Sequence, residues 1–84
     1  MAHVVIYSSA HCPYCVRAKR LLEAKNILYT EIRVDEDPSQ REAMIAKSNR
    51  QTVPQIFIDE LSIGGFDDMY ALDVKGELDK LLRG

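Results

Sequence analysis

The sequence predicts an α/β fold: a four-stranded mixed sheet with flanking helices, in the order β-α-β-α-β-β-α. The first half of the chain reads strand, helix, strand, which implies a right-handed parallel crossover. The second half holds two short apolar runs around Asp59-Glu60, which predicts an antiparallel hairpin in the same sheet. A chain of 84 residues fits a single domain, residues 1–84, and is too short for two cores.

The spacing of apolar residues predicts the first strand–helix–strand unit. Residues 3–7 are rich in β-branched side chains and predict a buried strand. Residues 13–25 predict a helix with three core candidates, Val16, Leu21 and Leu22. Residues 28–34 alternate as a strand requires, and we expect one face to carry Leu28, Thr30, Ile32 and Val34.

The remaining elements complete the sheet and its helices. They are a loop over 35–38, a helix over 39–47, a polar loop over 48–53, and strands over 55–58 and 61–63. Ala43 and Met44 are the expected inward side chains of the second helix. Gly64-Gly65 leads into a last helical region over 67–82, in which Gly76 marks a break.

Composition and charge exclude several classes of protein. The net charge of −2 gives no basic footprint for nucleic acid. No apolar run approaches the roughly 20 residues that span a bilayer. The start, Met1-Ala2-His3, lacks the basic region and the small-residue cleavage site of a secretory signal. We therefore expect a cytoplasmic protein that binds neither nucleic acid nor membrane. We also expect a monomer.

The most informative stretch is Cys12-Pro13-Tyr14-Cys15, which lies between the first strand and the first helix. A helix N-terminus offers unpaired N–H groups and a partial positive charge, and both favour a thiolate. Pro13 suits the first helical position, because its missing N–H costs nothing there. Cys12 is then the cap residue and Cys15 lies one turn further on the same side.

Two cysteines at this spacing have several possible roles. A structural disulfide across so tight a loop gives little entropic stabilisation. A zinc site needs about four ligands, and only His3 and His11 could join the two thiols. The order strand, CxxC, helix favours a redox dithiol over a purely structural thiol pair, and we expect no metal site. His11 either favours the Cys12 thiolate as an imidazolium or faces solvent.

Two further motifs follow the cysteines: Thr52-Val53-Pro54, and Gly64-Gly65-Phe66-Asp67-Asp68. With these three motifs in this order, the chain resembles the glutaredoxins of the thioredoxin-like fold, and most of all the small dithiol glutaredoxins of bacteria. The resemblance covers almost the whole chain. Two positions depart from the pattern: Ser9 stands where many relatives have lysine, and Phe66 where relatives often have a third cysteine.

The resemblance implies catalytic roles for Cys12 and Cys15 as a redox-active pair, and a cis Val53–Pro54 bond that packs against them. It also implies that the following residues bind glutathione: Tyr14, Arg41, Gln51, Thr52, Val53, Pro54, Gly65, Phe66, Asp67 and Asp68. Glutathione would be a co-substrate, with no tightly bound cofactor. Residue chemistry leaves simpler roles open: helix capping for Asp67 and Asp68, and a solvated helix charge for Arg41.

The implied activity is glutathione-dependent reduction of protein disulfides and glutathione mixed disulfides. Its partners would be glutathione, disulfide-containing or glutathionylated proteins and, indirectly, glutathione reductase. Two other functions fit the same motif. One is a thioredoxin-like redoxin served by a flavoprotein reductase, and the other is a carrier of a glutathione-ligated [2Fe–2S] cluster between two subunits.

Overall fold

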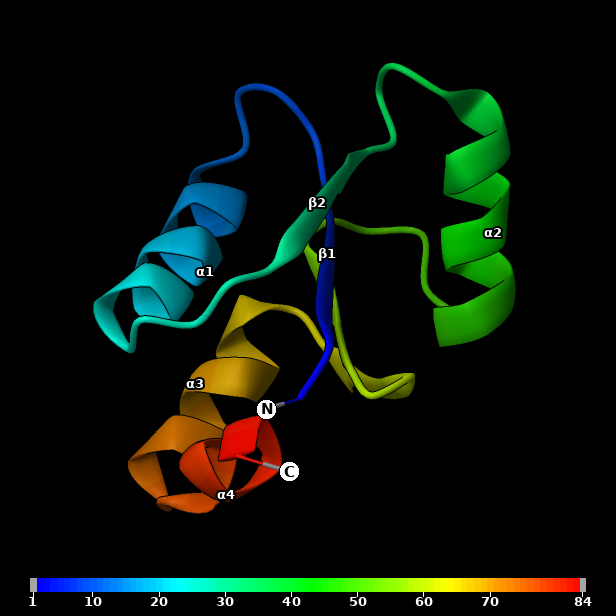
Figure 1. Cartoon of the computed structure of the whole chain (residues 1–84). Helices are drawn as coiled ribbons and strands as arrows, with labels where there is room; N and C mark the ends of the chain where they lie inside the picture. The colour runs from blue at the N-terminus through cyan, green and yellow to red at the C-terminus, as the bar shows by residue number, and fades with distance from the viewer. Residues whose placement is uncertain (1, 84) are drawn as a thin grey trace.

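A four-stranded mixed sheet in the order β2-β1-β3-β4 forms the centre of the computed structural model, which describes residues 2–83 (Figure 1). β1 (Val4–Ser8) pairs in parallel with β2 (Thr30–Arg33). β3 (Gln55–Ile58) pairs antiparallel with β1 and with β4 (Leu61–Gly64). The predicted four-stranded mixed sheet is confirmed.

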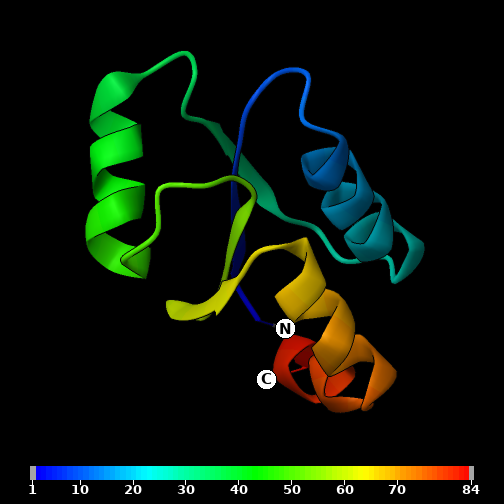
Figure 2. The same ribbon diagram turned by 180° about the vertical axis from the view of Figure 1, so that it is seen from behind.

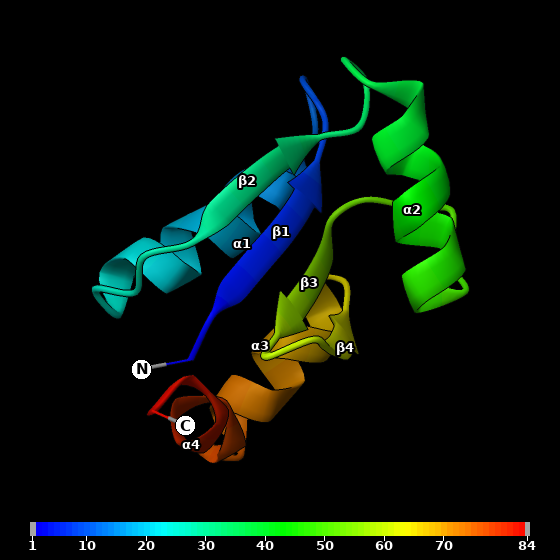
Figure 3. The ribbon, with the colours of Figure 1, turned by 45° about the vertical axis from the view of Figure 1, so that its right-hand side comes forward.

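Four helices cover the two faces of this sheet (Figure 3). α1 (Pro13–Ala24), α3 (Phe66–Val74) and α4 (Glu77–Arg83) pack on one face, and α2 (Pro38–Ser48) packs on the other. The two ends of the described chain lie close together (Figure 2), because the N–H of Ala2 donates to the carbonyl of Leu82 at 3.1 Å.

Alternation along β1 divides the apolar core into two clusters. Val4 and Ile6 point toward α1, α3 and α4, whereas Tyr7 points toward α2. The first cluster is the larger and contains Val4, Ile6, Ala18, Leu22, Ile56, Ile58, Met69, Leu78 and Leu82. The second contains Tyr7, Val34, Met44 and Phe57. The sheet is thus buried on both faces and gives the loops at its edge a fixed support.

One predicted core position is wrong, and one predicted strand begins too early. Val16 is exposed, because the buried stripe of α1 runs through Cys15, Ala18 and Leu22, and Val16 is turned away from it. Leu28 is 88% exposed and precedes β2, which begins only at Thr30. The apolar alternation therefore extended the predicted strand by two residues into a loop.

The last helical region is divided, as predicted, at Gly76. Its φ of +77° ends the run that begins with α3, and α4 starts at the next residue. The predicted inward residue Met44 is fully buried on α2, and its neighbour Ala43 is half-buried. Within residues 2–83, the helices lack the length and apolar character needed to cross a membrane.

Candidate active site

Cys12 lies at the N-cap of α1, as its position before Pro13 predicts. Its extended backbone (φ −111°, ψ 102°) starts the helix, and Pro13 occupies the first turn. The Cys12 Sγ accepts a hydrogen bond from the backbone N–H of Cys15 at 3.2 Å. Its sulfur therefore accepts from one of the N–H groups that a helix start leaves unpaired. His11, with a φ of 58°, is exposed in the preceding turn.

The second thiol has the opposite environment. Cys15 is 1% exposed within the first turn of α1. Burial, followed by the hydrogen bond to Cys12, raises the pKa of the Cys15 thiol to about 12. Both cysteines are free thiols in this structure. Because the thiolate is the reactive form of a cysteine, the half-buried Cys12 is the accessible nucleophile of the pair.

The 52–54 loop lies against the first thiol. The Val53–Pro54 peptide bond is cis, and the carbonyl oxygen of Val53 is 3.9 Å from the Cys12 Sγ. The fully buried Gln55 side chain fixes this loop from inside, since its Nε2 donates to the Thr52 carbonyl at 3.0 Å and to the Thr52 Oγ1 at 3.3 Å. Nothing in the sequence pattern pointed to this role for Gln55.

The start of α3 forms a cradle closed by Asp68. The Asp68 Oδ2 accepts from the backbone N–H of Gly65 at 2.9 Å and from the Arg50 Nη1 at 2.8 Å. Arg50, followed by the Gly65 N–H, holds the pKa of Asp68 below its usual value. Gly64 has a φ of +110°, and a Cβ there would collide with the Asp68 carboxylate. Asp68 therefore caps the helix, one of the two roles that the sequence left open.

One groove of about 220 Å³ joins the loop and the cradle. Its lining contains eight of the ten residues that the resemblance assigned to glutathione: Tyr14, Thr52, Val53, Pro54, Gly65, Phe66, Asp67 and Asp68. The ninth lining residue is Arg50, which sequence reasoning missed. Arg41 and Gln51 are exposed and do not line this groove. Only the fold brings Arg50 to Asp68, 18 residues further along the chain.

A second hollow, of about 320 Å³, lies beside Cys12 and includes Ser9 in its lining. The charged side chains of this hollow are Lys19, Glu31 and Arg33, and the Lys19 Nζ is paired with Glu31 at 2.9 Å. Cys12 lines this hollow, whereas its link to the groove is the contact with Val53. Both hollows therefore lie next to Cys12: one contains it in its lining, and the other contains Val53, which contacts it.

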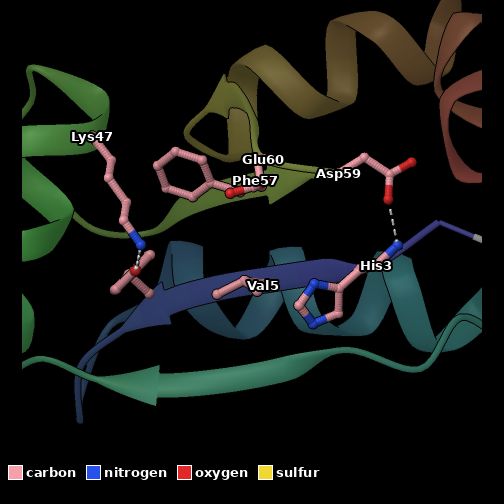
Figure 4. Close-up of a pocket in the computed structure, with 7 residues that line it drawn as sticks. His3, Val5, Lys47, Phe57, Asp59 and Glu60 are labelled. Atoms are coloured by element: carbon pink, nitrogen blue, oxygen red, sulfur yellow. Dashed lines mark hydrogen bonds between the residues drawn. The ribbon is translucent and has the colours of Figure 1, made fainter.

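A larger hollow, of about 520 Å³, is not next to the thiols. It lies on the α2 side of the sheet, where Lys47 reaches the Tyr7 hydroxyl at 3.4 Å and His3 stands beyond Val5 (Figure 4). It contains neither cysteine, so the size of a hollow does not by itself locate the reactive centre.

The structure also offers no metal site among residues 2–83, because no three His, Cys, Asp or Glu side chains are grouped so that they could hold a metal ion.

Comparison with known proteins agrees with this geometry. The glutaredoxin family model matches residues 4–63. Glutaredoxin 3 of Escherichia coli (strain K12) is 54% identical over 83 residues, which cover 99% of this chain and 100% of that protein. A glutaredoxin of Brucella melitensis has a TM-score of 0.86 at 48% identity, over 98% of this chain and 89% of that one. A buckwheat glutaredoxin–glutathione complex has a TM-score of 0.90 at 28% identity, over 98% and 77%.

The relatives match the chain from its first strand to its last helix, so the likeness is not confined to one motif. The family match spans the segment that holds Cys12 and Cys15, and the likeness in structure extends over the fold that supports it. A half-buried cap thiol beside a fully buried one also suits the exchange of disulfides. The chain therefore belongs to the glutaredoxin family, and its chemistry is that of a thiol–disulfide oxidoreductase.

Proposed function

We propose that the protein uses glutathione to reduce protein disulfides and glutathione mixed disulfides. The observation that carries this proposal is the groove beside Cys12, which joins the 52–54 loop to the start of α3. Binding of glutathione in the buckwheat relative, at a TM-score of 0.90, supports it.

The groove offers groups that match both ends of glutathione. At the γ-glutamyl end, the first N–H groups of α3 at Phe66 and Asp67 take the α-carboxylate, and the exposed Asp67 takes the ammonium. Arg50 adds a guanidinium that binds carboxylates. We propose Arg41 and Gln51 as further contacts, at the glycine carboxylate.

The middle of glutathione lies along the 52–54 loop in this proposal. The backbone of Val53 pairs with the extended tripeptide by strand addition. Tyr14 and Phe66 form an aromatic wall, and Thr52 and Pro54 form the rest of the groove. The glutathione sulfur then lies next to the Cys12 Sγ, because the Val53 backbone that binds the tripeptide is itself in contact with that sulfur.

With a glutathionylated substrate, the Cys12 thiolate attacks the glutathione sulfur. The Cys12–glutathione disulfide forms, the old disulfide breaks, and the substrate leaves as a thiolate that takes a proton from water. The thiolate of a second glutathione then attacks the bound glutathione sulfur. Glutathione disulfide leaves, and Cys12 returns as a thiolate.

With a protein disulfide, the Cys12 thiolate forms a mixed disulfide with one substrate sulfur and releases the other. Cys15 then loses its proton and attacks the Cys12 sulfur, which releases the substrate as a dithiol and closes the Cys12–Cys15 disulfide. Two glutathiones reduce that disulfide and leave as glutathione disulfide. We also propose that the protein acts as a cytoplasmic monomer, with its glutathione kept reduced by glutathione reductase.

A coupled assay tests the proposal: 2-hydroxyethyl disulfide, glutathione, glutathione reductase and NADPH. We expect NADPH oxidation that requires both glutathione and the protein, and that is lost in Cys12→Ser. A parallel reaction replaces glutathione and its reductase with thioredoxin reductase. Turnover in that reaction alone would contradict the proposal and support a thioredoxin-like redoxin.

A further inference from the structure

An aromatic row leads away from the groove along the outer surface. It consists of Tyr14 on α1 and of Phe66 and Tyr70 on α3. The ring centroids of Tyr14 and Phe66 are 6.4 Å apart, and those of Phe66 and Tyr70 are 5.8 Å apart in a stacked arrangement. The row therefore crosses from one helix to the other as a continuous surface.

The row begins inside the groove and ends outside it. Tyr14 and Phe66 line the groove, whereas Tyr70 does not and is 52% exposed. Val74, four residues after Tyr70 on the same side of α3, is also exposed. Phe66 packs against the core, but Tyr14 and Tyr70 leave about half of their surface to solvent. Single exposed apolar side chains are ordinary, but a continuous row next to a reactive thiol indicates contact with a partner.

The row has a positive charge at its α1 end. The Arg17 guanidinium lies 5.1 Å from the centroid of the Tyr14 ring. No carboxylate within residues 2–83 forms an ion pair with Arg17. The ring orients the guanidinium without neutralising it, so its charge is available to an acidic group of a partner.

We propose that the aromatic row and Arg17 bind the polypeptide part of disulfide substrates. The occupant is an extended segment that carries an aromatic or large apolar side chain near its reactive cysteine, and an acidic residue toward Arg17. Continuity with the redox centre supports this occupant, since a substrate whose sulfur meets Cys12 must cover the surface around it. When glutathione occupies the groove, the part of the row outside it, Tyr70 with the neighbouring Val74, remains open to the protein substrate.

This inference deepens the proposed function and rests on it for the site, yet it can be tested without glutathione. The probe is a set of short synthetic peptides, each with one internal disulfide. In one set of peptides, the four positions before and the four positions after the attacked cysteine are tested one at a time, with either Phe or Ser at the tested position. In a second set, the tested position carries either Asp or Asn. The measurement is the second-order rate constant for reduction of each peptide by the prereduced protein.

Tyr70→Ser is the main variant, because Tyr70 lines neither the groove nor the hollow that contains Cys12. Leu61→Ser is its matched control, since Leu61 on β4 is 54% exposed and is not part of the row. At the best position, Tyr70→Ser should reduce the preference for Phe over Ser by about three- to tenfold, the range for one aromatic contact. Leu61→Ser should leave that preference unchanged.

Arg17→Ser should reduce the preference for Asp over Asn, and salt should reduce it in the unsubstituted protein as well. Reduction of 2-hydroxyethyl disulfide should stay the same in both variants, which separates substrate docking from damage to the thiols. The inference is overturned if the unsubstituted protein shows no preference for Phe, or if Tyr70→Ser slows every disulfide equally. Loss of glutathione turnover with the peptide preferences intact would instead count against the proposed function alone.

Discussion

At the scale of single residues, two thiols only three positions apart in the sequence have opposite environments. Cys12 is at the helix cap and within reach of a substrate, whereas Cys15 is buried with a pKa raised to about 12. The CxxC spacing alone predicted a redox pair and placed Cys12 at the cap. The burial of Cys15 on the inward face of α1 is a property of the folded chain, which the motif does not encode.

Cys12→Ser should abolish reduction of every disulfide, since the buried and protonated Cys15 cannot reach a substrate. Cys15→Ser should keep most of the activity toward a glutathionylated peptide, which needs only one thiol, and lose at least about tenfold toward protein disulfides, which need a resolving thiol. The measurement is turnover of the two substrate types at fixed glutathione. Appreciable activity of Cys12→Ser toward either substrate would contradict the assignment of the nucleophile.

Asp68 serves the helix and, in our proposal, the ligand groove. Asp68→Asn keeps an oxygen for the Gly65 N–H but removes the negative charge that faces Arg50. Because this ion pair is half exposed, we expect the free energy of unfolding to fall by less than about 1 kcal/mol. The apparent KM for glutathione should rise by at least about threefold, because Arg50 loses its position in the groove.

Asp67→Asn is the matched comparison for this change. Asp67 is an exposed neighbour on the same turn of α3, outside the contacts that Asp68 makes. Its substitution should leave thermal unfolding unchanged and raise the KM for glutathione. If Asp68→Asn lowers only the melting temperature and leaves KM unaltered, Asp68 is a cap and nothing more.

At the scale of elements, the sequence predicted the order of strands and helices because apolar periodicity is local. It failed where an element's end depends on its neighbours: Leu28 continued the strand pattern, but the chain is still leaving α1 there, with Asn26 at a φ of 59°. Most of the groove could be predicted, because eight of its lining residues lie in three short sequence motifs. Arg50 escaped prediction because its pairing with Asp68 exists only in the folded chain.

Two glycines at element boundaries offer a comparison of backbone strain with steric collision. Gly64 and Gly76 both have positive φ, of +110° and +77°. A Cβ at Gly76 would have open space, whereas one at Gly64 would lie 2.8 Å from the Asp68 Cγ and 3.0 Å from the Arg50 Nη1. Alanine therefore has a conformational cost at both positions, which is larger at Gly64 because +110° lies further from the left-handed region, and only Gly64 also lacks room for a Cβ.

Gly76→Ala should lower the free energy of unfolding by about 1 kcal/mol, the cost of a left-handed alanine. Gly64→Ala should lower it by clearly more and should also weaken glutathione use, because the Asp68 carboxylate must move out of the cradle. Denaturant unfolding and glutathione KM, measured on both variants, decide the matter. Equal destabilisation by the two substitutions would mean that the cradle yields easily.

At the scale of the whole molecule, charged side chains connect elements that are far apart in sequence. Lys25 at the end of α1 pairs with Asp73 of α3 at 2.7 Å and with Asp79 of α4 at 2.8 Å. Asp35, after β2, accepts from Arg33 and from the backbone N–H of Ala10 in the turn before Cys12. These contacts hold the turn before Cys12 and the two C-terminal helices against the rest of the chain.

Acid should therefore destabilise the protein as a whole. Hydrogen-bonding or ion-pair partners lower the pKa of five carboxyl groups: Glu31, Asp35, Asp37, Asp68 and Asp79. A pKa that is lower in the folded than in the unfolded chain stabilises the fold above the unfolded value, about 4. That contribution disappears as pH falls through the folded value. The free energy of unfolding should thus be nearly constant from pH 7 to 5 and decline below pH 4.

Urea unfolding at a series of pH values between 7 and 2 measures this decline. Asp35→Asn should be less stable than the unsubstituted protein at pH 7 and should lose less on acidification, because one of the five groups no longer titrates. Since these groups are largely exposed, about 1 M salt should also flatten the curve. A stability that stays level down to pH 2 would mean that the carboxylate contacts contribute nothing to the fold, and that the turn before Cys12 depends on backbone packing alone.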